Sequence, residues 1–178
     1  HPKYVAALVD YIVDDFQHSR VALSDSTIGG MIVCDSSDQA RMVDQELNRY
    51  SQVSHILILH DVEDKETRRR YTDDFKKGKI DLLVVYNMLL TGFDAPRLKK
   101  QYLGRVIKEH NLLQTLTRVN RPYKAFRYGY VVDFADIRAE FDKTNQAYFK
   151  ELQAELGDEF ERYSNIFKSQ EEVEQELR

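Results

Sequence analysis

The stretch Asp81-Leu-Leu-Val-Val-Tyr-Asn-Met-Leu-Leu-Thr-Gly-Phe-Asp-Ala-Pro96 runs from a continuous apolar segment into a turn containing Gly, Asp and Pro. An uninterrupted apolar run of this kind is typical of a β-strand that is buried on both faces. Comparable runs recur along the chain and predict strands over residues 31–34, 55–59, 80–86, 100–106 and 128–134. Segments with helical periodicity separate them, and this alternation indicates a mostly parallel sheet with helices on both faces.

The helical segments have recognisable starts and stops. Ser36 is placed to cap a helix, with Gln39 completing a capping box. Gly78 and Pro122 follow two other periodic stretches and predict where those helices end. The predicted helices lie over residues 3–19, 36–47, 65–77, 111–121 and 137–156. We therefore expect an α/β fold with a leading helix over 1–20, a sheet domain over 21–135 and a C-terminal helical extension over 136–178.

Composition limits the class of protein. The 178 residues, 42% of them hydrophobic and 31% charged, suffice for one sizeable core, and no apolar run approaches the roughly 18 residues of a membrane span. The single Cys excludes an internal disulfide, and no leader pattern is found, which together predict a cytoplasmic protein without a membrane partner. The chain opens without Met and stops within a polar helical pattern, so we expect it to be part of a longer protein.

Charge is segregated along the chain. The net charge of −4 argues against a general affinity for nucleic acid. Residues 95–127 nevertheless carry nine basic residues against Glu109 alone, whereas residues 133–178 carry thirteen acids and six bases. The basic band comprises Arg97, Lys99, Lys100, Arg105, Lys108, Arg118, Arg121, Lys124 and Arg127. It fits either a phosphate-handling face or an ordinary solvated surface.

The sequence lacks the motifs of several well-known kinds of active site. A nucleotide hydrolase of this architecture needs a glycine-rich loop that ends in Gly-Lys-Ser or Gly-Lys-Thr, but the sole Gly-Lys pair is Gly78-Lys79, followed by Ile80. The five His and one Cys have no zinc-binding spacing, so no metal site is predicted. The chain by itself offers no complete catalytic machinery.

Loops at the carboxyl ends of parallel strands commonly form the ligand crevice. This rule singles out three segments: residues 35–37, residues 87–96 and the segment that enters the 111–121 helix. Within the second, Gly92 permits close backbone approach, and Asp94 is placed to accept a ribose hydroxyl or to fix an arginine. A surface turn in which Asp94 caps its own backbone is the alternative.

The helix over 111–121 combines an apolar stripe with a polar one. Gln114, Arg118 and Arg121 stand at i, i+4 and i+7 and should share one face. Planar guanidinium groups so placed suit the negative charge of a transferring phosphoryl group. A helix that turns its charged side to water has the same spacing.

Taken together, these motifs resemble a known family. The order of Met31–Cys34, Thr91-Gly-Phe-Asp94 and Gln114-x-x-x-Arg118-x-x-Arg121 is similar to motifs IV, V and VI of the second RecA-like domain of superfamily 2 helicases. Two segments resemble the restriction (R) subunit of type I restriction endonucleases: Leu-Leu-Thr-Gly-Phe-Asp-Ala-Pro-Arg and, further on, Arg-Val-Asn-Arg-Pro-Tyr. Thr117 and Asn120, where many helicases differ, favour the restriction branch.

The resemblance implies roles for particular residues. Arg118 and Arg121 would be catalytic, reaching the γ-phosphate of ATP held by another motor domain, with Gln114 in support. Gly92 and Asp94 would lie near the ribose, and Ser36 and Thr91 toward the DNA backbone. ATP and Mg²⁺ would be the cofactors of the intact protein, with none bound by this chain alone. Double-stranded DNA and the methylation and specificity subunits would be its partners.

The resemblance implies an ATP-dependent DNA translocase and endonuclease subunit, inactive as this fragment alone. Two alternatives stay open: another superfamily 2 DNA or RNA helicase, and a non-enzymatic protein-interaction module in which the basic band is only surface. Salt-dependent DNA binding that weakens when Lys99 and Lys100 are neutralised would argue against the second alternative.

Overall fold

The computed structural model describes residues 2–61, 64–88 and 93–156. Its helices are α1 (Pro2–Ala22), α2 (Ser37–Leu47), α3 (Lys65–Lys76), α4 (Glu109–Thr117) and α5 (Arg138–Leu156). Its strands are β1 (Gly29–Val33), β2 (His55–Ile58), β3 (Leu82–Val85), β4 (Leu98–Leu103) and β5 (Tyr130–Asp133). The remainder of the predicted C-terminal extension, residues 157–178, lies outside the described residues.

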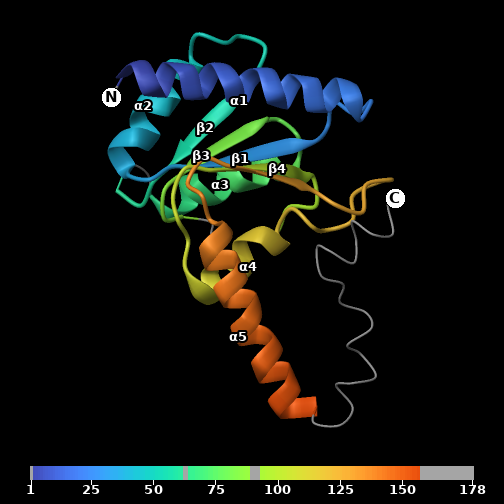
Figure 1. Cartoon of the computed structure of the whole chain (residues 1–178). Helices are drawn as coiled ribbons and strands as arrows, with labels where there is room; N and C mark the ends of the chain where they lie inside the picture. The colour runs from blue at the N-terminus through green and yellow to red at the C-terminus, as the bar shows by residue number, and fades with distance from the viewer. Residues whose placement is uncertain (1, 62–63, 89–92, 157–178) are drawn as a thin grey trace, which may run out of the picture.

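The described strands form one sheet in the order β2-β3-β1-β4-β5, and every neighbouring pair is parallel. Helices α1 and α2 cover one face, and α3 and α4 cover the other (Figure 1). The apolar runs explain this arrangement, because alternate residues of a strand point to opposite faces. In β1, Ile32 joins the core under α1 and α2, whereas Met31 and Val33 join the core under α3 and α4. The predicted α/β class with a parallel sheet is confirmed.

Local signals set the helix ends. The hydroxyl of Ser36 accepts a hydrogen bond from the backbone N–H of Gln39 at 3.1 Å, as an N-cap should. The Gln39 side chain accepts from the backbone of Asp35 at 2.8 Å, one residue earlier than a capping box requires. Gly78 follows α3 with φ of +82°, in the left-handed region that glycine adopts without strain.

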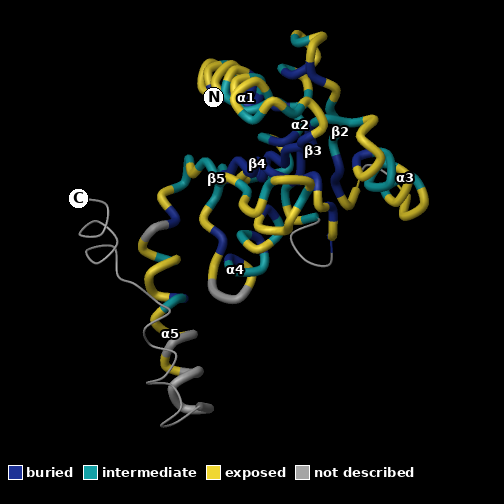
Figure 2. The backbone as a smooth tube through the Cα atoms, turned by 90° about the vertical axis from the view of Figure 1, so that its right-hand side faces the viewer, coloured by how far each residue is buried: buried dark blue, intermediate teal, exposed yellow. Residues whose placement is uncertain are grey.

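Helix α5 leads away from the sheet (Figure 1), and the described residues at its start lie against α4. Ile137, just before α5, is buried at 8% exposure, whereas Phe141 in its first turn is 37% exposed. Figure 2 shows a similar contrast between the buried strands β3 and β4 and the more exposed residues among those of α5 that it colours. Within the described residues, no helix is long and apolar enough to cross a membrane.

The basic band does not form one surface. Three of its members are between 1% and 5% exposed, because β4 is an interior strand covered on both faces: Arg97, just before β4, and Lys99 and Lys100 within it. The Arg97 guanidinium donates to the carbonyls of Thr27 at 2.9 Å and of Phe75 and Ile80 at 2.7 Å each. The interpretation of these residues as solvated or DNA-facing is therefore wrong. Neutralising Lys99 and Lys100 would perturb the interior rather than a DNA surface.

Candidate phosphate-facing pocket

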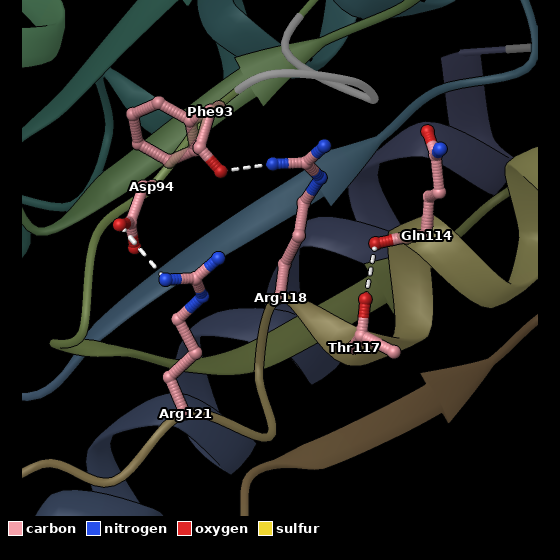
Figure 3. A pocket seen from close by; sticks show the side chains of 6 residues that line it. All are labelled: Phe93, Asp94, Gln114, Thr117, Arg118 and Arg121. Carbon is pink, nitrogen blue, oxygen red and sulfur yellow. Dashed lines mark hydrogen bonds and ion pairs between the residues drawn. The ribbon is translucent and has the colours of Figure 1, made fainter.

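The described residues with the predicted chemistry line one pocket of about 290 Å³ (Figure 3). Three parts of the fold supply its walls. Gln114 and Thr117 come from α4, Arg118 and Arg121 from the turn after it, and Phe93 and Asp94 from the segment that leads into β4. The residues singled out from the sequence, Asp94, Gln114, Arg118 and Arg121, are thus brought together.

Hydrogen bonds connect the two sides of the pocket. Arg118 Nη1 donates to the backbone carbonyl of Phe93, and Arg121 Nη1 donates to Asp94 Oδ2 at 2.8 Å (Figure 3). The side chains of Arg121 and Asp94 are each 52% exposed. An ion pair this exposed contributes only about 0–1 kcal/mol, so a stronger anion could displace the carboxylate at little cost.

The arginines do not share a helical face as predicted, because α4 ends earlier. The helix stops at Thr117, and Arg118 is its C-cap. The next hydrogen bonds are of the tighter i to i+3 kind, from Arg118 to Thr115 at 3.4 Å and from Asn120 to Thr117 at 3.2 Å. Arg121 therefore reaches the pocket from an irregular turn.

The pocket also lies at the opposite end of the sheet from the one that the carboxyl-end rule favoured. Lys99, the second residue of β4, donates to the carbonyls of Val119 and Arg121, which places the exit of α4 beside the amino end of β4. Helix α4 leaves the carboxyl end of β4 and must return to the amino edge to begin the parallel strand β5. The prediction that the entrance of this helix forms the site is wrong for this pocket.

Electrostatics favour an anion in the pocket. Its described lining holds two guanidinium groups and one carboxylate. Burial lowers the pKa of Arg118, and the neighbouring charge of Arg121 lowers it further. Since a bound anion would relieve this repulsion, the pocket is suited to a negatively charged group. No cluster of three His, Cys, Asp or Glu able to hold a metal ion occurs among the described residues.

Other predicted site residues lie elsewhere. Thr91 and Gly92 fall outside the described residues. Ser36 follows β1 at the carboxyl end of the sheet, away from the arginines, and its hydroxyl serves as the α2 cap. Sequence reasoning missed the contributions of Phe93 and Thr117. Their proximity to Asp94 and Arg118 in the sequence was the available signal.

Solved helicase structures share this fold. The Pyrococcus furiosus Hef helicase domain matches 85% of this chain and 28% of its own chain, with a TM-score of 0.54 and 14% identity. Domain 2 of the DEAD-box helicase Mss116p, solved bound to an RNA duplex, matches 83% of this chain and 56% of its own, with a TM-score of 0.58 and 18% identity. The fold is therefore that of a RecA-like helicase domain.

The family is narrower than the fold. The family model described as type I restriction enzyme subunit R domain 3 matches residues 29–136, and this chain belongs to that family. The endonuclease subunit assigned to the type I restriction enzyme MjaVIIP of Methanocaldococcus jannaschii is 38% identical over 97 residues, 54% of this chain. The SauCOLORF180P endonuclease subunit of Staphylococcus aureus is 40% identical over 68 residues, 38% of this chain. The chain spans 9% and 7% of these two relatives.

Proposed function

We propose that this domain is the second motor domain of a type I restriction endonuclease subunit and that Arg118 and Arg121 act on ATP held by another motor domain of the same protein. The pocket lined by both guanidinium groups and by Asp94 carries the proposal, because it presents more positive than negative charge in an open cavity. Family membership supports the restriction subunit over other helicases.

The two arginines would act in different ways. Arg121 would exchange its exposed contact with Asp94 for a phosphate oxygen, since that ion pair contributes little in water. Arg118, half-buried and held by the Phe93 carbonyl, would present a fixed donor to charge that develops during phosphoryl transfer. Gln114 would support this contact from α4, and Asp94 would then be released toward the ribose hydroxyls.

In the intact protein, closing and opening of the two motor domains around the nucleotide would move duplex DNA, with Ser36 and Thr91 toward its backbone, and a separate nuclease domain would cut it. The residues that line the pocket fit the phosphate end of an ATP site, where Mg²⁺ would be held by groups outside this pocket. Methylation and specificity subunits would be partners, in the cytoplasm. This chain alone would not hydrolyse ATP.

Single substitutions in the intact subunit test the proposal. Arg118→Ala or Arg121→Ala should lower kcat for ATP hydrolysis by about 10³- to 10⁵-fold, as loss of an arginine finger does. Arg127→Ala is the matched control, because Arg127 belongs to the same basic band but is exposed and not among the residues that line the pocket. Unchanged hydrolysis in both pocket variants would refute the assignment, as would ATP turnover by this chain alone.

A further inference from the structure

Lys99 is a buried lysine without a carboxylate partner among the described residues. Lys99 is 1% exposed, and its ammonium group donates to the backbone carbonyls of Val119, at 3.1 Å, and Arg121. Burial lowers the pKa of Lys99, as expected for a cation removed from water. Lysines are rarely buried without an ionic partner, so the two carbonyl contacts must offset the cost of removing this ammonium group from water.

The two carbonyls belong to the turn that carries the pocket arginines. The end of an α-helix leaves carbonyl groups without intrahelical donors and concentrates partial negative charge there. An ammonium group from β4 satisfies two carbonyls just beyond this end, one on each side of Asn120. Lys99 therefore fixes the backbone between Arg118 and Arg121 through these two carbonyls.

A second element confines the same turn from another direction. A Cβ atom added to Gly129 would lie 2.3 Å from the Val119 carbonyl oxygen and 2.5 Å from Val119 Cβ. The chain before β5 thus packs directly on the Val119 backbone, which only a glycine permits. With Lys99 on one side and Gly129 on another, the turn has little freedom to shift.

We propose that Lys99 is a positioning residue, which holds the turn over residues 118–121 so that both arginines point into the pocket. This inference rests on the proposed function. Mispositioning a catalytic group by about 1 Å can cost about 100-fold in rate, so the backbone clamp is expected to matter for turnover.

The neighbouring Lys100 provides a matched control. It is also buried, at 5% exposure, but its ammonium group pairs with Asp15 on α1 at 2.7 Å, on the opposite face of the sheet. Lys99→Met and Lys100→Met therefore each remove one buried ammonium group from adjacent positions of one strand. Only the first removes the contacts to the arginine turn.

The test compares ATP hydrolysis by the intact subunit at a temperature where both variants remain folded. Lys99→Met should lower kcat about 10- to 100-fold and change KM for ATP by less than about threefold, whereas Lys100→Met should keep kcat within about threefold. In a background that carries Arg118→Ala and Arg121→Ala, Lys99→Met should have no further effect. Equal kcat values for Lys99→Met and Lys100→Met would overturn the inference.

The outcomes separate this inference from the proposed function. If both arginine variants retain full activity, the proposed function fails. If they lose activity while Lys99→Met keeps it, the proposed function stands and the positioning role fails. Where Lys99→Met does not fold, Lys99→Gln replaces it, and hydrogen exchange over residues 118–121 should be faster than in Lys100→Met. Unchanged exchange and kcat in folded Lys99→Gln would also contradict the role.

Discussion

Replacing Arg97 with Met tests whether the buried cation just before β4 stabilises the fold. The guanidinium donates to the carbonyls of Thr27, Phe75 and Ile80, and it lies 4.7 Å from the centre of the Phe75 ring. The Phe75 carbonyl keeps the Gly78 amide as a donor at 3.0 Å, so the substitution leaves the carbonyls of Thr27 and Ile80 without the guanidinium. A buried carbonyl that loses its donor costs about 1–3 kcal/mol, so these two cost about 2–6 kcal/mol. Arg97→Met also removes the cost of burying the guanidinium charge, which offsets part of the loss from the carbonyls. We therefore expect the substitution to lower the free energy of unfolding by about 3 kcal/mol.

Urea unfolding of this chain, followed by far-ultraviolet circular dichroism, measures the effect. A loss of about 3 kcal/mol corresponds to a Tm lower by about 6–12 °C for a protein of this size. Arg127→Met is the control, because the exposed Arg127 should change stability by less than about 0.5 kcal/mol. A loss below about 1 kcal/mol for Arg97→Met would refute the structural role of this residue.

Three further predictions concern the surroundings of the core and the arginine turn. Gly129→Ala should destabilise the chain by about 1–3 kcal/mol in urea unfolding, because its Cβ would lie 2.3 Å from the Val119 carbonyl; unchanged stability would contradict this packing. Burial acts to raise the pKa of Asp25, but hydrogen bonds from Lys124 and Thr27 outweigh it and lower the pKa from 3.8 to about 2. The stabilisation from Asp25 is thus present above about pH 4 and lost as the pH falls toward 2. The difference in unfolding free energy between wild type and Asp25→Asn should therefore vanish over that interval. A difference that persists at pH 2 would disprove the linkage. Burial, with the nearby charge of Asp35, raises the pKa of Cys34 to about 12, so a disulfide reagent at pH 8 should modify the thiol only in urea; rapid labelling of the folded chain would show the opposite.

Much of the fold was predictable because strands buried on both faces have a plain apolar signature. The run Leu82–Val85 is buried at every position, and the Ser36 cap and Gly78 stop act through neighbours in the sequence. By contrast, Leu-Lys-Lys-Gln-Tyr-Leu in β4 is also buried throughout, although half of it is polar. The partners of its two lysines are backbone carbonyls and Asp15, which lie in distant parts of the chain, so no local sequence pattern predicts that the strand is buried.

The candidate site was predicted in its residues but not in its construction. The spacing of Gln114, Arg118 and Arg121 gave the correct grouping from a helix that in fact ends at Thr117. The carboxyl-end rule singled out residues 87–96, which do contain Asp94, but it favoured the entrance of the 111–121 helix, whereas the pocket lies at the exit of that helix. Here the polar groups lie on the turn after α4 and on the segment before β4, at the amino edge. A parallel sheet requires the chain after each helix to return to the amino edge before the next strand begins. This requirement could have placed the end of α4, with its arginines, at the amino edge.

A structure of the intact subunit with ADP and aluminium fluoride tests the central claim most directly. The account predicts that Arg118 and Arg121 donate to the fluoride group at about 2.7–3.1 Å and that Arg121 has left Asp94. If Arg121 stays on Asp94 and neither guanidinium reaches the fluoride group of a closed, nucleotide-bound subunit, these arginines do not serve phosphoryl transfer, and the account is contradicted.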